Sequence, residues 1–185
     1  MDIYRNPDKV YEHTNKGNTV AVITDGTRVL GLGDIGPEAG LPVMEGKALI
    51  YKYLGGVDAI PIPIATKDHN EFIHVVSLLE PAFGGINLED ISHPKCFIIL
   101  RELQEKMNIP VWHDDQQGTA TITLAGLINA LKVVGKPMDK VKIAFIGAGA
   151  SNVAITRLIF TAGANPQICT VVDSKGILHT GRTDL

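Results

Sequence analysis

The stretch Val141-Lys142-Ile143-Ala144-Phe145-Ile146-Gly147-Ala148-Gly149-Ala150-Ser151-Asn152 decides the fold class. Its apolar first half predicts a buried strand, and the Gly-rich turn that follows opens an apolar segment of helical length. The same order of strand and helix recurs throughout the N-terminal part of the chain. Because this alternation is typical of crossover units around a largely parallel sheet, the sequence predicts an α/β protein.

Short runs rich in β-branched residues predict strands at 19–24, 59–64, 85–88, 109–112, 141–146 and 168–172. Helical patterns lie between them at 43–54, 69–79, 93–107, 119–134 and 151–162. Pro42 before the first helix, and Ser92 and Thr119 at two others, are the expected start signals. A polar Gly/Pro break over 135–140 precedes the last strand–helix–strand unit, which we expect to belong to a second domain.

Composition excludes several classes of protein. The chain has 185 residues, 45% hydrophobic and 20% charged, with a net charge of −3, which excludes disordered and fibrous chains. No basic face is evident, which argues against nucleic acid and anionic membranes as partners. No apolar run approaches the roughly 20 residues of a membrane span and no targeting segment is visible, so we expect a cytoplasmic protein. Cys96 and Cys169 are expected to be buried, reduced thiols, and Trp112 to lie in the core.

Lys47 is the least expected side chain of the predicted helix 43–54. It falls in the middle of an apolar stripe formed by Val43, Met44, Ile50, Tyr51 and Leu54. Burial or a nearby cation lowers the pKa of a lysine, which then serves as a general base near neutral pH. The alternative is a lysine whose stem covers apolar surface while its charge reaches solvent.

Two acidic pairs follow the ends of predicted strands. Glu89 and Asp90 come after 85–88, and Asp114 and Asp115 come after 109–112. α/β proteins bind ligands beyond the carboxyl ends of their strands. Adjacent carboxylates repel, and a divalent cation such as Mg²⁺ or Mn²⁺ would explain their grouping. The alternative is that these acids favour the first turns of helices.

Gly147 and Gly149 lie between a strand and a helix, where backbone N–H groups bind pyrophosphate. Asp173 ends the next predicted strand about 20 residues past this loop, where an acid meets the adenosine ribose. Asn152 departs from the dinucleotide fingerprint, which has Gly or Ala for close packing, so we expect the helix slightly further from the strand. Together these features predict a dinucleotide site.

A second Gly-rich turn, over residues 31–37, lacks the Lys-Ser/Thr ending of a phosphate loop. We interpret it as a tight connection that brings Arg28 and the helix of Lys47 together. Arg28 has the geometry to bind a substrate carboxylate, although a lone arginine near a turn is more often simply solvated.

Four segments together resemble the malic enzymes, especially the small prokaryotic type: TDGTRVLGLGDIGP at 24–37, VMEGK at 43–47, FGGINLED at 83–90 and HDDQQGTA at 113–120. The match continues in one order from about Asn6 to the C-terminus. The resemblance implies a malic enzyme N-terminal α/β domain over 1–112 and the start of a Rossmann-type NAD(P)-binding domain over 113–185. It also implies a homodimer.

The implied reaction is oxidative decarboxylation of L-malate to pyruvate and CO₂ through oxaloacetate, with reduction of NAD⁺ or NADP⁺. By resemblance, Lys47 is the general base and Arg28 contacts a substrate carboxylate, while Asp114 tunes Lys47. Three acids match the ligands of Mg²⁺ or Mn²⁺, namely Glu89, Asp90 and Asp115. The cofactor would be held by Gly147, Gly149, Ala150, Ser151, Asn152, Asp173 and Ser174. Asp173 favours NAD, while Ser174 and Lys175 leave NADP open.

Two departures from the family pattern affect the expected activity. The family's catalytic tyrosine lies in a Tyr-Thr-Pro segment upstream of Asn6, and neither Tyr4 nor Tyr11 aligns with it. Much of the cofactor domain, including an Asn-containing loop, is also absent. We therefore expect an internal piece of a malic enzyme of about twice this length. The alternatives are a non-catalytic metal- or nucleotide-binding remnant and a decarboxylase of oxaloacetate that performs no redox step.

Overall fold

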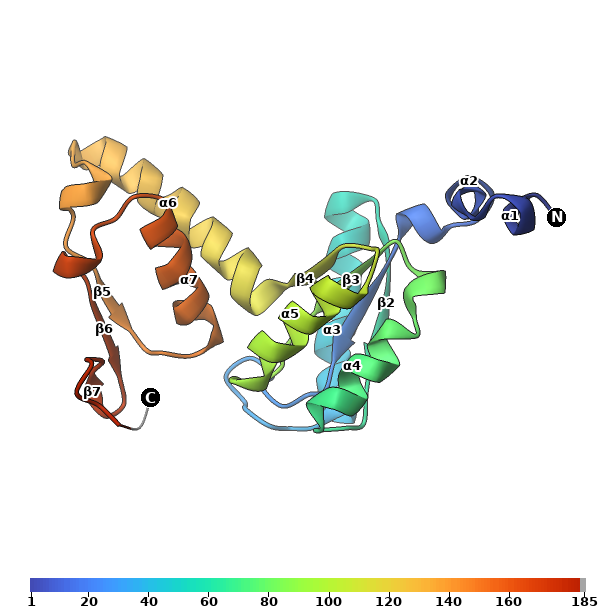
Figure 1. The fold of residues 1–185 in the computed structure, drawn as a ribbon, viewed down its shortest axis with the longest axis horizontal. Coiled ribbons are helices and arrows are strands. Elements are labelled where there is room, and N and C mark those ends of the chain that lie inside the picture. Colours follow the sequence, from blue (N-terminus) through green and yellow to red (C-terminus); the bar gives the residue numbers. More distant parts are fainter. Residues whose placement is uncertain (184–185) are drawn as a thin grey trace. The chain divides into compact units, whose positions relative to one another are not determined.

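The chain folds into two compact units, Met1–His113 and Asp114–Leu185, each described here by itself (Figure 1). The structure is a computed structural model that describes residues 1–183; the last two positions of the predicted second domain, 184 and 185, lie outside the described residues. The first unit contains one parallel sheet, and the second contains a smaller mixed sheet.

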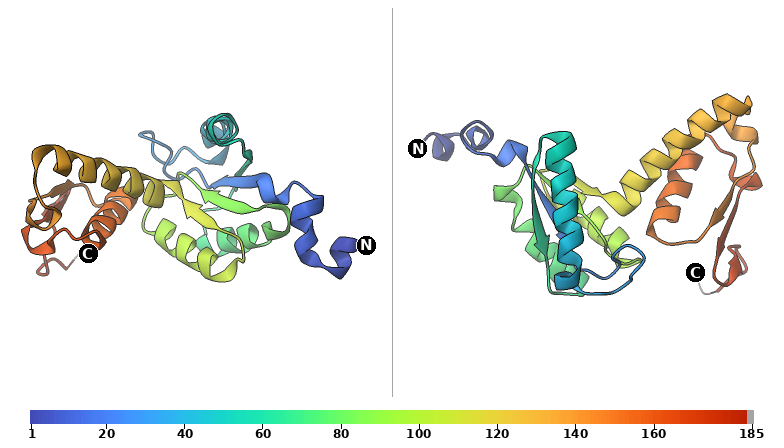
Figure 2. Two further views of the ribbon diagram at one scale, coloured as in Figure 1. Left: turned by 90° about the horizontal axis from the view of Figure 1, so that it is seen from above. Right: turned by 180° about the vertical axis from the view of Figure 1, so that it is seen from behind.

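The first unit is built on a four-stranded parallel sheet in the order β2-β1-β3-β4. Its strands are β1 (Thr19–Thr24), β2 (Asp58–Pro63), β3 (Gly85–Leu88) and β4 (Val111–His113). Helix α3 (Pro37–Gly55) covers one face, and α4 (His69–Ser77) and α5 (Lys95–Lys106) cover the other (Figure 2). The short helices α1 (Asp2–Arg5) and α2 (Val10–His13) precede the sheet. Single 3-10 turns lie at Pro7–Lys9 and Lys16–Asn18, before β1, and at Glu80–Ala82, before β3.

The central strands form the core of this unit and align their ends. β3 is buried along its whole length and β1 along most of it, as expected for parallel strands covered on both faces. Leu88 pairs with Ile23 on one side and with His113 on the other. The segments that leave β1, β3 and β4 therefore start from the same edge of the sheet.

The second unit combines two helices with a three-stranded sheet in the order β5-β6-β7. The elements are α6 (Thr119–Val134), β5 (Ala144–Ile146), α7 (Ala150–Thr161), β6 (Thr170–Asp173) and β7 (Gly176–Ile177), with a π-helical turn at Asp114–Gly118 and 3-10 turns at Met138–Lys140 and Pro166–Ile168. β5 and β6 are parallel, and β7 is antiparallel to β6. Phe145 and Phe160 pack edge to face in its core, 6.0 Å apart.

The predicted strands and helices all occur, most of them with shifted ends. β1, β3 and α6 have the predicted bounds, while the two-residue strand β7 was too short to be predicted. Pro42 lies inside α3, which begins at Pro37 after Gly36, so the start signal was assigned to the wrong proline. Ser92 and Thr119 are not N-caps, because Pro94 and Gly118 hold those positions.

Trp112 is the clearest error in the predicted core. Trp112 is 38% exposed because β4 lies at the edge of the sheet and, among residues 1–183, pairs with β3 alone. Cys96 is buried as predicted, Cys169 is half-buried, and both are free thiols. No helix within residues 1–183 is long and apolar enough to cross a membrane.

Candidate active site

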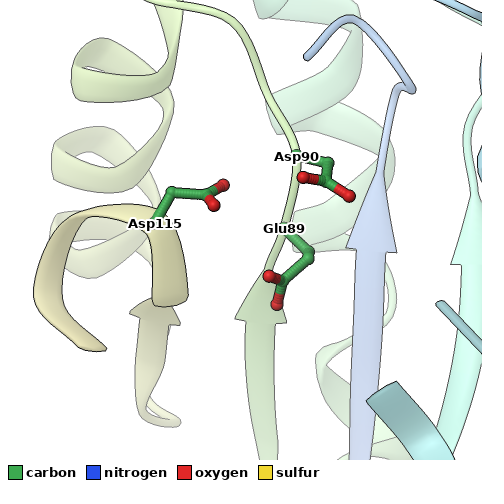
Figure 3. Close-up of side chains that lie close together, drawn as sticks. All are labelled: Glu89, Asp90 and Asp115. Atoms are coloured by element: carbon green, nitrogen blue, oxygen red, sulfur yellow. The ribbon is translucent and has the colours of Figure 1, made fainter. Parts of the chain in front are cut away.

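Three carboxylates meet beyond the ends of β3 and β4 (Figure 3). Glu89 and Asp90 directly follow β3, and Asp115 lies in the turn that follows β4. One oxygen from each lies within 4.8 Å of the others, and both Glu89 and Asp90 are buried. Three hard, anionic oxygen donors at this spacing fit Mg²⁺ or Mn²⁺, which would neutralise their mutual repulsion.

Lys47 contacts this cluster from helix α3. Its Nζ lies 3.2 Å from Glu89 Oε2, and the two side chains are 22% and 11% exposed. The predicted apolar stripe is buried only in part, because Met44 is enclosed whereas Ile50 and Leu54 are 53% and 76% exposed. Lys47 thus belongs to the buried end of the stripe, where it faces a carboxylate.

Two side chains to which the sequence analysis gave no functional role connect to the same glutamate, Asn87 directly and Tyr51 through Asn87. Asn87 Nδ2 donates to Glu89 Oε2 at 2.9 Å, and Tyr51 Oη donates to Asn87 Oδ1 at 3.0 Å. Asn87 is 1% exposed. The sequence signal for this contact was a polar amide between two apolar residues, Ile86 and Leu88.

The loop after β1 holds Asp90. The backbone N–H of Arg28 donates to the Asp90 carbonyl at 3.0 Å, and that of Leu30 donates to Asp90 Oδ1 at 3.3 Å. Both Leu30 (φ 47°) and Asp90 (φ 55°) have left-handed backbones, which side chains other than glycine rarely adopt. Conformational strain is therefore concentrated beside a predicted metal ligand.

The Arg28 side chain is exposed, and its Nη1 donates to the Leu30 carbonyl at 2.9 Å. The turn that carries it is closed at its base, where the N–H of Gly36 donates to the Gly26 carbonyl at 3.1 Å. A Cβ on Gly26 would lie 2.2 Å from Gly36 backbone atoms, so only glycine fits there. The structure thus contains the predicted tight connection into α3.

A buried ion pair, also missed from the sequence, supports this loop. Asp25 Oδ2 lies 2.5 Å from Lys95 Nζ on α5, with side chains 1% and 17% exposed. Asp25 Oδ1 accepts from the Thr27 N–H at 3.0 Å and from its hydroxyl at 2.6 Å. The Thr27 hydroxyl in turn accepts from the Ser92 N–H at 3.0 Å. These contacts join the loops after β1 and β3.

Asp114 is half-buried in the turn that opens α6. A Cβ on Gly118 would lie 2.2 Å from Asp114 Oδ1, so the carboxylate occupies the space that the glycine leaves. The hydroxyl of Thr119 donates to the Asp114 carbonyl at 3.4 Å. Gly118 therefore determines where the Asp114 side chain can lie.

The Gly-rich loop has the predicted strand–loop–helix context. Gly147 has φ 106°, and its N–H donates to the Val172 carbonyl at 2.7 Å, which ties the loop to β6. Asn152 Nδ2 donates to the carbonyls of Ile146 (2.6 Å) and Gly147 (3.2 Å). The unexpected asparagine thus braces the loop from the first turn of α7. Ala150 and Ser151 begin that helix.

Asp173 ends β6, the neighbour of β5, as expected for an acid at a ribose site. Arg182, which the sequence analysis did not single out, binds it with two contacts of 2.9 and 2.8 Å. The N–H of Lys175 donates to Asp173 Oδ1 at 2.8 Å, and Ser174 is exposed in the same tight turn. A guanidinium therefore lies beside the predicted ribose acid.

The class that these features define is an α/β protein of two units, with a lysine beside an acidic cluster at the edge of a parallel sheet and a Gly-rich strand–loop–helix turn in the second unit. The family described as "Malic enzyme, N-terminal domain" matches residues 3–104, and "Malic enzyme, NAD binding domain" matches residues 116–185.

Individual relatives agree with these family matches. A bifunctional malic/malolactic enzyme of Bacillus subtilis is 55% identical over 98% of this chain and 44% of its own length. An NADP-dependent malic enzyme of Haemophilus influenzae is 46% identical over 100% of this chain and 24% of its own length. The crystal structure of a malic enzyme from Pyrococcus horikoshii has a TM-score of 0.91 at 57% identity, covering 98% of this chain and 41% of that one.

The chain belongs to the malic enzyme family, which confirms the resemblance and the α/β fold predicted from the sequence. It spans less than half the length of the relatives named above.

Proposed function

We propose that this chain carries the base, the metal ligands and the nucleotide loop of an enzyme that oxidatively decarboxylates L-malate to pyruvate and CO₂ with reduction of NAD⁺ or NADP⁺. The observation that carries the proposal is the contact of Lys47 with the acidic cluster of Glu89, Asp90 and Asp115. Membership of the malic enzyme family supports this choice of reaction.

Each part of the site has a role in this reaction. Lys47, in its neutral form, takes the proton of the C2 hydroxyl as hydride leaves C2 for the nicotinamide. Arg28 binds a substrate carboxylate with its guanidinium. Asp114 tunes Lys47. The three carboxylates would hold Mg²⁺ or Mn²⁺, which would supply Lewis acidity to the substrate oxygens.

The nucleotide is the second component of the proposal. Gly147, Gly149, Ala150, Ser151 and Asn152 form the loop and helix start that would bind the pyrophosphate. Asp173 would accept ribose hydroxyls, with Ser174 beside it. The adjacent guanidinium of Arg182 also suits a 2′-phosphate, so the proposal includes both NAD and NADP.

The setting of the enzyme also belongs to the proposal. We propose cytoplasmic location, homodimers, and small-molecule partners only, namely malate, pyruvate and oxaloacetate. Size-exclusion chromatography with light scattering measures the state of assembly directly, and a monomer at all concentrations would contradict the dimer.

Lys47→Ala tests the base. In the protein at its natural length, with Mn²⁺ and either nucleotide, the substitution should lower malate-dependent NAD(P)H formation by about 10²- to 10⁴-fold, as expected for loss of a general base. Lys106→Ala, at an exposed position on α5, is the matched control. Wild-type turnover in Lys47→Ala would refute the assignment.

The same assay separates the alternatives. Malate oxidation by the wild-type protein excludes a non-catalytic remnant. Decarboxylation of oxaloacetate without malate oxidation would instead support the decarboxylase that needs only the acidic cluster.

A further inference from the structure

Helix α3 and strand β3 meet through four polar side chains in an unbroken series. Tyr51 donates to Asn87 (3.0 Å), Asn87 donates to Glu89 Oε2 (2.9 Å), and Lys47 Nζ lies 3.2 Å from the same oxygen. The established family membership assigns no role to Tyr51 or Asn87.

Local structure explains why these four side chains meet. Lys47 and Tyr51 are four residues apart on α3 and therefore lie on one face of the helix. Asn87 and Glu89 are two residues apart at the end of β3, so they lie on one face of the strand. Each element thus presents a matched pair to the other.

The direction of the hydrogen bonds is fixed by the ionised carboxylate. A carboxylate only accepts, so Asn87 must turn its NH₂ group toward Glu89. Its carbonyl oxygen then points to Tyr51, whose hydroxyl must donate. At 1% exposure, an amide flip would break the bond to Glu89 and place two oxygens in contact where water cannot compensate.

We propose that Tyr51 and Asn87 are positioning residues that hold the Glu89 carboxylate in the orientation in which it binds the divalent metal. Oε2 is held from two directions, by Asn87 and by Lys47, which fixes the plane of the carboxylate and hence the position of Oε1. The inference rests on the metal site of the proposed function. Partners of metal-ligating carboxylates commonly set their orientation in this way.

Tyr51→Phe is the direct test, because it removes one hydroxyl and keeps the ring. Binding of Mn²⁺ to this chain is measured by electron paramagnetic resonance of the free ion, without any turnover. We expect roughly tenfold weaker Mn²⁺ binding in Tyr51→Phe. Asn87→Ala, which removes the amide itself, should weaken binding at least as much.

Tyr53→Phe is the matched control, since Tyr53 lies on the same helix and is 83% exposed. It should bind Mn²⁺ as the wild type does. Thermal melting of each variant separates loss of fold from loss of affinity. The side-chain amide NMR signals of Asn87 provide a further readout, because they should shift in Tyr51→Phe and stay unchanged in Tyr53→Phe.

The outcomes separate the two proposals. Wild-type Mn²⁺ affinity in a folded Tyr51→Phe or Asn87→Ala variant would overturn the positioning role and leave the metal site intact. No Mn²⁺ binding by the wild-type chain would overturn the metal site and the positioning role with it. Weaker binding in both variants, with Tyr53→Phe unaffected, supports the proposal.

Discussion

Replacing Lys95 by Met breaks the buried ion pair that supports the loop after β1. The substitution keeps most of the side-chain volume and removes the ammonium, which lies 2.5 Å from Asp25 Oδ2. Asp25 is 1% exposed at its side chain and so keeps a charge with little access to water. We expect Lys95→Met to destabilise the first unit more than an ordinary substitution on the surface of a helix does.

The magnitude follows from the exposure of the two partners. Loss of one partner from a buried ion pair costs about 3–5 kcal/mol, because the other charge stays buried. Lys95 is 17% exposed, so some water reaches the site, and Asp25 retains both hydrogen bonds from Thr27. We therefore expect a smaller loss, of about 2–3 kcal/mol in the free energy of unfolding, which reaches only the lower limit of that range.

Urea denaturation followed by fluorescence measures this loss. Trp112, the single tryptophan of the chain, lies on β4 of the same sheet and reports on this unit. With a denaturant slope of about 1 kcal/mol per molar, the midpoint should fall by roughly 2 M. Asp25→Asn combined with Lys95→Met should be more stable than Lys95→Met alone, because no charge is left buried.

Lys67→Met provides the control for this experiment. Lys67 also pairs with an aspartate, Asp34, at 2.6 Å, but the side chains are 67% and 47% exposed. An exposed pair contributes less than about 1 kcal/mol. The reasoning would be refuted if Lys95→Met lowered the midpoint no more than Lys67→Met, or if the double variant were less stable than Lys95→Met.

Two further predictions concern stability. The side chain of Lys52 donates a hydrogen bond to Asp58 and holds the pKa of this carboxyl below its ordinary value of 3.8. The resulting stability is present at neutral pH and is lost as pH falls through the lowered pKa, so the urea midpoints of wild type and Asp58→Asn should converge on acidification; a widening gap would contradict this. Lys16 is buried and donates to backbone carbonyls of the turn 80–83, so Lys16→Met should cost about 2–4 kcal/mol by urea denaturation. Lys106→Met, at an exposed position, should stay within about 0.5 kcal/mol of wild type.

The strands and helices were predictable where local pattern and burial agree. β1 and β3 are central and apolar, and their bounds were found to the residue. The prediction that Trp112 is buried was wrong because an aromatic residue in a strand pattern does not indicate whether the strand is central or at the edge of the sheet. α3 began earlier than expected because both Pro37 and Pro42 satisfy the start signal, and only the closed turn at Gly26 and Gly36 selects the first.

The predicted metal ligands stood out in the sequence because all three are acids grouped just after the ends of apolar strands. The residues that contact or hold these acids have no comparable signal in the sequence. Tyr51 and Asn87 are 36 residues apart, and either would be unremarked in its own segment. Asp25 and Lys95 likewise become significant only when β1 and α5 are packed together. Pairing across the fold, rather than local pattern, identifies these residues.

The left-handed residues of the site show why its geometry was not predictable from its loops. Leu30 and Asp90 both adopt a left-handed backbone, which costs roughly 1–2 kcal/mol for a residue such as leucine and less for aspartate. The Leu30 N–H bond to Asp90 Oδ1 offsets part of that cost, and the Asp25–Lys95 pair, through Thr27 and Ser92, holds the two loops that carry these residues. The strain and its compensation come from segments far apart in the chain, so the shape of this loop depends on the assembled sheet. It follows that substitutions at Asp25 or Lys95 should disturb Asp90 before they disturb the strands.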